Sequence, residues 1–558
     1  MKRNQIFLWT IICLFLALSG CTAVEKPPDI QLVSTPLVPT PFLPSNPEVS
    51  PTPAPSFSGL VFSEQTPFAL NGFTHNTPIV EGDGAQMISG AAAADFNNDG
   101  WMDLFIIGGG NNLDGLFINQ GNGTFQDVAV SAGVAGPQLG SGVAVGDYDN
   151  DGDVDIFVTS FGVPGEMGPG HHRLYRNNGD LTFTNMAAEA GVNRTSPELP
   201  DGLGASFGDY DLDGDLDLFV AGWRKPDGKP ALGNRLFRNN GDGTFTDVTT
   251  EAGIVDDGIR GFNPCFADMD GDRFPEILLS ADFGTSRYFH NNANGTFTDV
   301  TNKNKVDEVW SGMGAAVADL NNDGMLDWYV TAIFDDENVG RGDGNKLYLN
   351  QGKGKFSEAA SSLGLADGGW GWGALILDLN NDTRPDIMNV NGWDLEAYAN
   401  EATKVWLQQP DRTFLESAAA VGLNAPTNNL GLLNLDYDND GDQDLLTTAY
   451  NDAIQLYRND LTGADTHWLR VRLDTGGQAG LAPDGVGSRV SVRVGDTILT
   501  RYQSGCSHYL TQSEQILHFG LGPFIVVDEL VVGWANGAIT HLTGLPADQI
   551  LTITPTSQ

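Results

Sequence analysis

Short apolar segments recur along most of the chain in a fixed order, with polar turns between them. A first apolar run, such as 142–145, leads into an acidic loop, and a second, such as 155–158, follows it. A third segment of the form Leu-Tyr-Arg-Asn (174–177) precedes a Gly- and Asn-rich turn and a fourth segment, Thr-Phe-Thr-Asp-Val (244–248). Alternating segments bounded by Asn-Gly turns are typical of antiparallel strands. Each repeat is therefore predicted to form one four-stranded sheet.

The period of this repeat predicts the fold. Acidic loops begin at Asp95, Asp147, Asp209, Asp268, Asp319, Asp378 and Asp436, so successive loops lie 51 to 62 residues apart. Four strands in a unit of this length are typical of a propeller blade, and a small isolated sheet buries too little apolar surface to be stable alone. We expect an all-β protein with a seven-bladed β-propeller over residues 59–462.

The seventh repeat lacks its own fourth strand. After the third segment at 456–459, no further segment of the repeat follows, whereas residues 60–64, ahead of the first acidic loop, have the fourth-strand pattern. We predict that residues 60–64 form the outer strand of the last blade, which leaves no open edge between the first and last blades. Residues 463–558 contain different short alternating runs, at 468–473, 489–494 and 529–534, which predict a small β-sandwich.

The first 58 residues have the features of an export signal and a stalk. Lys2 and Arg3 precede an apolar run at 6–18 that is too short to span a membrane permanently, and this run ends in Leu-Ser-Gly-Cys21. This pattern resembles a lipobox, with a signal peptide over 1–20 and a lipid on Cys21; an ordinary secretory signal is the alternative. Residues 21–58 are rich in Pro, Thr and Ser and indicate a semi-rigid stalk, or a disordered tail. We expect an exported protein anchored to a bacterial membrane and facing the periplasm or the cell exterior.

Composition narrows the partners. The formal net charge is −43 although only 18% of residues are charged, so the acidic groups are largely unopposed. Phosphate binding needs a basic face, which argues against nucleic acid, whereas metal cations suit such an excess of carboxylates. Cys13 and Cys21 belong to the signal and the lipid site, and Cys265 and Cys506 lie in different predicted domains. We therefore expect no disulfide framework to hold the exported protein together.

The acidic loops have the oxygen spacing of a calcium site. Side-chain oxygens stand at positions 1, 3, 5 and 9 of each loop, and position 7 can add its backbone carbonyl. Ca²⁺ is a hard ion that takes about six to eight oxygen ligands in flexible geometry. The predicted ligands are Asp95, Asn97, Asp99, Trp101 and Asp103; Asp147, Asp149, Asp151, Asp153 and Asp155; Asp209, Asp211, Asp213, Asp215 and Asp217; Asp268, Asp270, Asp272, Phe274 and Glu276; Asp319, Asn321, Asp323, Met325 and Asp327; Asp378, Asn380, Asp382, Arg384 and Asp386; and Asp436, Asp438, Asp440, Asp442 and Asp444.

Alternatives to calcium propeller loops fit less well. An EF-hand needs a Glu at position 12 and flanking helices, and solvated loops without metal would have to repeat one spacing seven times.

Gly at position 6 permits the sharp turn; Arg273 and Thr383 replace it in the fourth and sixth loops, where we expect strain or weaker binding. Because unneutralised carboxylates at this spacing repel one another, we expect up to seven structural calcium ions to hold the fold together. Saturated protein ligation leaves no position open for a substrate.

These residues resemble a known family. The acidic hairpin loops resemble the FG-GAP/VCBS repeats of integrin α-subunit propellers and bacterial surface proteins. Segments 484–489, 518–522 and 534–537 resemble the ASPIC/UnbV domain, although Ala535 stands where that family usually has Pro. The combination, in this order, is similar to the family of cartilage acidic protein and its bacterial relatives. The resemblance implies a calcium-binding extracellular protein.

The connections opposite the acidic loops carry candidate ligand-binding residues: Trp223, Arg224, Arg260, Trp310, Trp370 and Trp393. Exposed aromatics around a central opening suit recognition of a glycan or peptide; the alternative is that these side chains pack between blades. His171 and His172 are adjacent and should point apart, which argues against a metal pair.

The main functional hypothesis is a tethered recognition or adhesion protein whose ligand is an unknown extracellular glycan or protein. A secreted, lyase-like enzyme acting on polysaccharide is the alternative, and a scaffold for a protein partner is a third. The sequence contains no nucleophile–base signature, phosphate loop or His-rich catalytic set, so no catalytic residue is assigned.

Overall fold

The chain forms two units, Met1–Ser56 and Phe57–Gln558, and the second contains every residue described below. The structure, a computed structural model, describes residues 59–78, 86–136, 138–162, 171–193, 202–223, 233–254, 258–335, 342–393, 398–399, 401–424 and 426–555. The signal peptide, Cys21, the stalk and Arg224 lie outside the described residues. No helix within the described ranges is long and apolar enough to cross a membrane.

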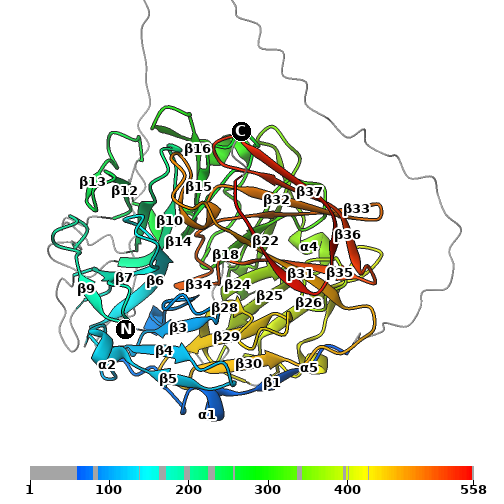
Figure 1. The fold of residues 1–558 in the computed structure, drawn as a ribbon, viewed down its shortest axis with the longest axis horizontal. Helices are drawn as coiled ribbons and strands as arrows, with labels where there is room; N and C mark the ends of the chain where they lie inside the picture. Colours follow the sequence, from blue (N-terminus) through cyan, green and yellow to red (C-terminus); the bar gives the residue numbers. More distant parts are fainter. Residues whose placement is uncertain are drawn as a thin grey trace, which may run out of the picture. The chain divides into compact units, whose positions relative to one another are not determined.

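Seven sheets, each built on four antiparallel strands, follow one another along the described chain, and the first of them gains a fifth, parallel strand from the C-terminal segment (Figure 1). We call them blades 1 to 7, and the acidic loop between the first two strands of each blade is loop 1 to loop 7. Blade 1 contains β2 (Ala91–Ala94), β3 (Asp103–Ile106), β4 (Gly115–Asn119) and β5 (Phe125–Asp127); blade 2 contains β6 (Gly140–Gly146), β7 (Asp155–Ser160), β8 (Arg173–Asn177) and β9 (Phe183–Asn185); blade 3 contains β10 (Gly202–Gly208), β11 (Asp217–Gly222), β12 (Arg235–Asn239) and β13 (Phe245–Asp247); blade 4 contains β14 (Arg260–Ala267), β15 (Glu276–Asp282), β16 (Arg287–Asn291) and β17 (Phe297–Asp299).

The later blades repeat the same order. Blade 5 contains β18 (Ala315–Ala318), β19 (Asp327–Val330), β22 (Lys346–Asn350) and β23 (Phe356–Glu358), with a small hairpin of β20 (Phe334–Asp335) and β21 (Gly342–Asp343) between them; blade 6 contains β24 (Gly371–Leu377), β25 (Asp386–Asn391), β26 (Lys404–Gln408) and β27 (Phe414–Glu416); blade 7 contains β28 (Asn429–Leu435), β29 (Asp444–Ala449) and β30 (Gln455–Asn459). One-turn helices lie beside this framework: α1 (Thr66–Ala69), α2 (Ala129–Ala132), α3 (Thr301–Asn304), α4 (Ala360–Leu363) and α5 (Ala418–Val421).

The ring closes as the strand order predicts. Strand β1 (Phe62–Glu64) pairs antiparallel with β30 of blade 7, with Phe62 opposite Asn459 and Glu64 opposite Tyr457. The N-terminal end of the propeller therefore supplies the fourth strand of the last blade. Inner strands β2 and β28 also contact each other, so blade 1 packs against blade 7. The described residues thus form a closed propeller of four-stranded sheets.

Glycines on the inner strands let neighbouring blades approach closely. A Cβ on Gly142 would lie 2.5 Å from the carbonyl oxygen of Leu203, and one on Gly204 would lie 2.2 Å from that of Phe262. Both distances are shorter than any real contact, so a larger residue at either position would push two blades apart. Glycine at these positions follows from the crowding of seven strands around one axis.

Each blade is also hydrogen-bonded to the preceding one through a buried side-chain amide. Asn177, the last residue of β8, donates from Nδ2 to the carbonyl oxygen of Phe96 in loop 1 at 2.9 Å. The equivalent donors and acceptors are Asn119 and Tyr437, Asn239 and Tyr148, Asn291 and Tyr210, Asn350 and Met269, Gln408 and Leu320, and Asn459 and Leu379. All acceptors occupy position 2 of an acidic loop, so each loop is held in place by the next blade.

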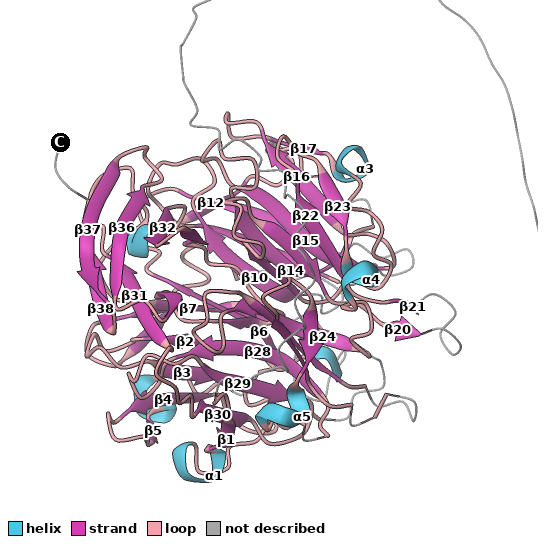
Figure 2. Cartoon of the chain, turned by 90° about the vertical axis from the view of Figure 1, so that its right-hand side faces the viewer, coloured by secondary structure: helices cyan, strands magenta, loops and turns pink. Residues whose placement is uncertain are grey.

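The C-terminal segment forms two further sheets, as the alternation predicts for a small sandwich. One contains β35 (Leu517–Gly522), β31 (His467–Leu473) and β38 (Gln549–Ile553); the other contains β33 (Thr497–Tyr502), β32 (Arg489–Val494), β36 (Val526–Gly533) and β37 (Ile539–Pro546). These strands gather on one side of the propeller sheets (Figure 2). Inward-facing side chains from both sheets, including Val471, Val492, Phe519 and Leu530, make one buried core.

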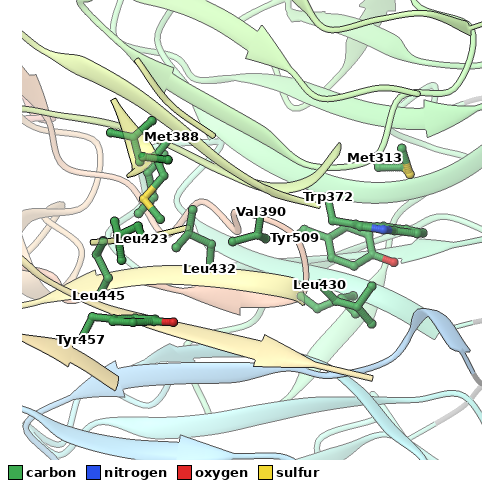
Figure 3. Packing of buried hydrophobic residues seen from close by; sticks show 14 of the residues in the cluster. Met313, Trp372, Met388, Val390, Leu423, Leu430, Leu432, Leu445, Tyr457 and Tyr509 are labelled. Carbon is green, nitrogen blue, oxygen red and sulfur yellow. The ribbon is translucent and has the colours of Figure 1, made fainter. Parts of the chain in front are cut away.

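One loop of the C-terminal domain, residues 503–516, enters the axis of the propeller; we call it the axial loop. Its strand β34 (Thr511–Gln512) pairs in parallel with β2 of blade 1. Within it, Tyr509 and Leu510 are fully buried in the central core, where Tyr509 lies beside Trp372 (Figure 3). The phenol ring is centred 4.9 Å from Trp372 and 5.7 Å from Phe262.

Backbone and side-chain hydrogen bonds fix the axial loop to many blades. The carbonyl oxygen of Leu510 accepts from the amide of Val143, and that of His508 accepts from the amide of Ala374, both at 3.1 Å. The Tyr509 hydroxyl donates to the carbonyl oxygen of Met87 at 2.9 Å, and the Thr511 hydroxyl donates to that of Leu432 at 2.7 Å. The loop therefore joins blades 1, 2, 6 and 7 at the axis.

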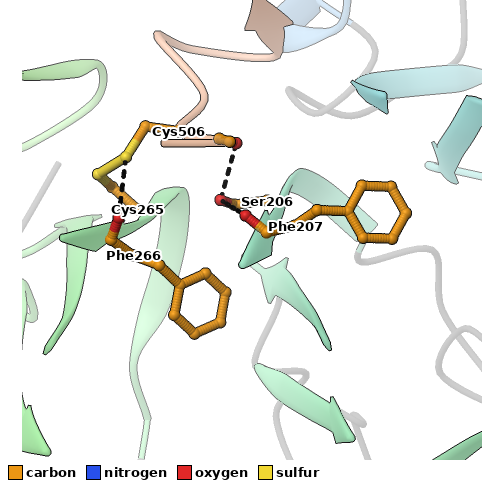
Figure 4. The surroundings of a disulfide bond; sticks show 6 residues. Ser206, Phe207, Cys265, Phe266 and Cys506 are labelled. Atoms are coloured by element: carbon orange, nitrogen blue, oxygen red, sulfur yellow. Dashed lines mark hydrogen bonds between the residues drawn. A yellow bond between two sulfur atoms is a disulfide. The ribbon is translucent and has the colours of Figure 1, made fainter. Parts of the chain in front are cut away.

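The expectation about cysteines is wrong. Cys265 on β14 and Cys506 in the axial loop form a disulfide bond across 241 residues (Figure 4). Beside it, the hydroxyl of Ser206 donates to the carbonyl oxygen of Gly505 at 2.9 Å. Sequence separation hid this pairing, because only the insertion of the axial loop brings the two cysteines together. The disulfide covalently joins the axial loop of the C-terminal domain to blade 4.

Candidate metal centres and the opposite face

The backbone of each acidic loop is wound around two of its own carboxylates. In loop 2, Asp147 at position 1 accepts hydrogen bonds from the amides of Asp151 at 3.0 Å and Gly152 at 2.9 Å. Asp155 at position 9 accepts from the amides of Tyr148 at 3.1 Å and Asn177 at 2.8 Å. These bonds fold the loop back on itself and turn the side chains of alternate residues toward one interior.

Two sharp bends complete the loop. Position 4 has a left-handed backbone, with a φ of 59° at Asn150, and so does position 6, with a φ of 92° at Gly152. In loops 4 and 6 the same conformation falls on Arg273 at 82° and Thr383 at 78°. Residues with a Cβ are strained there, which confirms the local strain predicted for these two loops.

The structure brings predicted ligands together as a cation site requires. In loop 2, one carboxylate oxygen from each of Asp147, Asp149 and Asp155 lies within 4.8 Å of the other two, and loops 3 and 7 repeat this arrangement with Asp209, Asp211 and Asp217, and with Asp436, Asp438 and Asp444. Position 3 provides an independent indication: Asp149 Oδ1, Asp211 Oδ1, Asn380 Oδ1 and Asp438 Oδ1 are buried oxygens without a hydrogen-bond partner. Buried acceptors without donors are rare, and a bound cation would satisfy them. The residues present therefore fit Ca²⁺.

Burial of the ninth-position carboxyls strengthens the argument for a cation. The side chains of Asp103, Asp155, Asp217, Glu276, Asp327, Asp386 and Asp444 are all fully buried. Burial raises the pKa of Asp103 to about 8 and that of Asp155 to about 9, and nearby carboxylates act in the same direction. Without a bound cation these groups would hold protons near neutral pH. A divalent cation that displaces the protons would stabilise the ionised form.

Positive side chains of the third strand accompany the loops that have an extra carboxylate, a pattern that the sequence analysis missed. The last residue of each third strand is the inter-blade Asn or Gln, whose side-chain amide bonds to the preceding blade. Where position 3 of the loop is Asp149, Asp211 or Asp438, the residue before this amide is Arg176, Arg238 or Arg458, respectively. Where position 3 is Asp270, it is His290. Where position 3 is Asn97, Asn321 or Asn380, it is the aliphatic Ile118, Leu349 or Leu407. Each arginine acts on its partner: Arg238 opposes the burial and the neighbouring Asp213 that raise the pKa of Asp211. An aligned set of the seven repeats carries this signal.

The predicted ligand-binding residues that the structure describes lie at the strand ends opposite the acidic loops and form two aromatic groups. In blades 3 and 4, the Arg260 guanidinium lies 5.5 Å from the centre of the Trp223 ring and 4.6 Å from that of Phe283. Trp223 also donates from Nε1 to Asp282 Oδ2 at 3.3 Å. We call Trp223, Arg260, Asp282 and Phe283 the blade-4 group.

The second group belongs to blade 6. Trp370 and Trp393 stack with their ring centres 5.3 Å apart and their planes 16° apart, and Trp370 meets Tyr398 edge to face. Trp393 also packs against Trp372, which contacts Tyr509 of the axial loop. Because Tyr509 in turn contacts Phe262, and Phe262 contacts Trp223, the two groups are joined through the axial loop.

The sequence left open whether these side chains are exposed for ligand recognition or packed between blades, and in the structure they are partly both. Trp223, Trp370 and Trp393 pack against the central core and keep partial exposure. Trp310 is partly buried beside the blade-4 group, where its carbonyl oxygen accepts from the Gly284 amide at 2.6 Å. Tyr509, which sequence analysis did not single out, lies between the groups.

His171 and His172 point apart as predicted. His172 is buried and accepts at Nδ1 from the Ser160 amide at 3.0 Å, whereas His171 is exposed.

Comparison with known proteins identifies both parts of the chain. The FG-GAP-like repeat model matches residues 95–158, 209–279, 268–330 and 334–388, and the ASPIC and UnbV model matches residues 478–558. The chain is an FG-GAP-repeat protein with an ASPIC and UnbV domain.

Cartilage acidic protein 1 from Mus musculus is 34% identical over 173 residues, which cover 30% of this chain and 24% of that protein. The Xenopus tropicalis protein is 29% identical over 226 residues, covering 38% of this chain and 31% of that protein. The chain thus matches only a quarter to a third of the length of these curated relatives.

Solved propeller structures are more distant. A Trypanosoma rangeli sialidase matches with 10% identity and a TM-score of 0.35, covering 73% of this chain and 60% of that chain. The BP39L lectin from Burkholderia pseudomallei matches with 9% identity and a TM-score of 0.41, covering 68% of this chain and 97% of that chain. Likenesses at this level contribute nothing to the functional argument.

The C-terminal domain, which includes the ASPIC and UnbV match over residues 478–558, covers the face that carries the acidic loops. Arg470 donates from Nη1 to Asp436 Oδ2 of loop 7 at 2.8 Å, and its Nη2 pairs with Glu514 at 2.5 Å. The side chains of all three residues are fully buried. Arg489 donates to the carbonyl oxygen of Gly324 in loop 5 at 2.7 Å. The domain therefore supplies part of the positive charge that the sequence analysis assigned to calcium alone.

Proposed function

We propose that this FG-GAP-repeat protein is an exported, lipid-anchored, calcium-loaded recognition protein that binds an extracellular glycan or protein through the face opposite the acidic loops. The placement of the ASPIC and UnbV domain carries the proposal. Because that domain covers the acidic-loop face and fills the axis, the opposite face is the one that keeps partly exposed aromatic groups. Partly exposed Trp side chains beside Arg and carboxylate groups suit stacking and hydrogen bonding to a sugar or peptide.

Export is supported by two features that differ in kind. The sequence over residues 1–21 resembles a lipoprotein signal ending in Cys21, and the disulfide between Cys265 and Cys506 is typical of an oxidising compartment. We propose a tether to the membrane through lipid on Cys21, with the folded part in the periplasm or outside the cell. Cys21→Ser should move the protein from the membrane fraction to the soluble fraction; unchanged fractionation would remove the tether from the proposal.

Binding arrays test the proposed recognition face. The probes are arrayed extracellular glycans and matrix peptides, applied with calcium present. Trp393→Ala, which breaks the stacked pair with Trp370, should lose at least tenfold in signal for any bound probe. Ile525→Ala is the matched control, because Ile525 is 65% exposed on the ASPIC and UnbV domain and should bind as wild type does.

Three outcomes of this experiment are informative. Loss of binding in Trp393→Ala, with wild-type binding in Ile525→Ala, supports the recognition face. Binding that survives in Trp393→Ala and Trp370→Ala contradicts it. New unsaturated sugar ends on a bound polysaccharide would replace the recognition hypothesis with the alternative, a secreted lyase-like enzyme.

A further inference from the structure

Blade 4 departs from the other six blades at the two positions that surround the interior of its acidic loop. Position 9 is Glu276 where every other loop has Asp, and the third strand carries His290 where the others have Arg or an aliphatic residue. The two changes face each other: His290 Nδ1 lies 2.9 Å from Glu276 Oε1 and 3.6 Å from Asp270 Oδ2. One ligand atom from each of Asp270, Glu276 and His290 lies within 4.8 Å of the other two.

The longer Glu side chain releases an oxygen that the other loops use to hold the backbone. In the other six loops, Oδ1 of the ninth residue accepts from the backbone amide of the inter-blade Asn or Gln at 2.7 to 2.9 Å. In blade 4, Glu276 Oε2 still accepts from the Met269 amide at 2.8 Å, but Oε1 faces His290. Glu276 is fully buried, so this oxygen has exchanged a backbone partner for a side chain that can itself bind a metal ion.

His290 differs chemically from the residues that replace it elsewhere. The equivalent Arg176, Arg238 and Arg458 neutralise charge but have no lone pair to offer a metal. A neutral imidazole nitrogen beside two carboxylates suits first-row transition metals, whereas Ca²⁺ prefers oxygen ligands alone. His290 Nδ1 and Glu276 Oε1 form a hydrogen bond at 2.9 Å, and the same separation is close to one edge of an octahedron with metal–ligand distances of about 2.1 Å, so a metal ion would take the place of the shared proton.

We propose that loop 4 is a transition-metal site, in which a divalent ion of the Mn²⁺ to Zn²⁺ series is held by His290 Nδ1, Glu276 Oε1 and Asp270 in place of calcium. The inference rests on the proposed cation binding by the acidic loops and assigns one of them a different ion. Asp270 also belongs to the trio Asp268, Asp270 and Asp272 of the same loop, so one ion engages the loop at a time. The competing explanation is that His290 is an imidazolium that replaces the arginine of blades 2, 3 and 7.

Cobalt titration in the presence of excess calcium separates these explanations. The chelator-treated full-length protein is saturated with Ca²⁺ and titrated with Co²⁺, while visible absorption and calorimetry report binding. We expect one Co²⁺ per chain with ligand-field absorption bands. His290→Arg should weaken Co²⁺ binding at least tenfold, and it should fold because it copies the residue of three other blades.

A surface histidine provides the matched control. His467 Nδ1 lies 2.7 Å from Asp548 Oδ2 on the C-terminal domain, so it is another imidazole–carboxylate pair that lies away from an acidic loop. His467→Ala should bind Co²⁺ as wild type does. The proposal is overturned if calcium-saturated protein binds no Co²⁺, or if His290→Arg binds Co²⁺ as well as wild type. Either result leaves calcium binding by the other loops intact, whereas failure of calcium itself to bind would show in the same calorimeter before Co²⁺ is added.

Discussion

The acidic loops and the axial loop hold the same seven blades together by different chemistry. At the loops, buried carboxylates with raised pKa values face one another, and either bound cations or arginine side chains must neutralise them. At the axis, Tyr509 and Leu510 are packed among apolar side chains, and hydrogen bonds and one disulfide fix the loop. Stability at the loops therefore depends on ions and pH, whereas stability at the axis depends on neither.

This difference assigns separate roles to the two ends of the chain. The propeller sequence provides the acidic loops but leaves its own axis to be filled by residues 503–516, which belong to the C-terminal domain. The C-terminal domain in turn places Arg470 and Arg489 against loops of the propeller. The central core of the propeller includes Tyr509 and Leu510 of the C-terminal domain, so we treat residues 59–555 as one folding unit.

Removal of calcium should have the largest effect. Each ion that binds only the folded state stabilises it by about 2.7 kcal/mol at a concentration 100 times its Kd, and several loops act together. Exhaustive EDTA treatment should therefore lower the melting temperature by more than 10 °C, as measured by calorimetry, and elemental analysis should show several calcium ions lost. An unchanged melting temperature and metal content would show that protons and arginines neutralise the loops without a metal ion.

Truncation of Tyr509 should come next, and it should not depend on calcium. Tyr509→Ala leaves a cavity beside Phe262 and Trp372 and is expected to reduce the free energy of unfolding by about 3–5 kcal/mol. Tyr509→Phe keeps the ring and loses only the hydrogen bond to Met87, for about 1–3 kcal/mol. Denaturant unfolding with and without EDTA measures both. A Tyr509→Ala effect that disappears in EDTA would contradict the separation of axis and loops.

The repeat spacing predicted the blades, the closing strand and the loop positions because each depends on local pattern. The acidic loops repeat one motif within a few residues, and residues 60–64 carry the same fourth-strand pattern as the other blades. The axial loop could not be found in this way. Cys506 and Tyr509 follow no repeat, and their partners Cys265 and Trp372 are more than 130 residues away in sequence. The pairing of Arg176 with Asp149 was present in the sequence and became evident only when the strands were aligned in space.

The pH dependence of the calcium-free protein should be opposite to that of the calcium-loaded protein. Burial raises the pKa of Asp103 and Asp327 to about 8 and that of Asp155 to about 9 in the folded state. Raised carboxyl pKa values stabilise the folded state below about pH 4 and lose that contribution as the pH rises through 8 to 9. In EDTA, the melting temperature should therefore fall between pH 5 and pH 8.5.

Calcium reverses the sign, because it favours the ionised carboxylates and effectively lowers their pKa values. Stability with calcium should be greatest at neutral pH and decline as the pH falls and protons compete for the ligands. Melting temperatures at matched pH values, with calcium and with EDTA, should give two curves of opposite slope. Parallel curves would mean that the carboxyl groups do not contact the ion.

Loss of one inter-blade amide should have the smallest effect and should be local. Asn177→Ala leaves the buried carbonyl oxygen of Phe96 without its donor and is expected to reduce the free energy of unfolding by about 1–3 kcal/mol. The neighbouring Asn178 is the control: its exposed side chain bonds only to the hydroxyls of Thr182 and Thr184, so Asn178→Ala should change stability by less than about 0.5 kcal/mol. Because Asn177 Nδ2 also donates to the carbonyl oxygen of Val154 in loop 2 at 3.2 Å, Asn177→Ala should also weaken calcium binding at loops 1 and 2, seen by calorimetry as two weaker sites among the rest. Equal effects of the two substitutions would show that the side-chain amides between blades do not support the acidic loops. Each blade would then hold its own loop unaided.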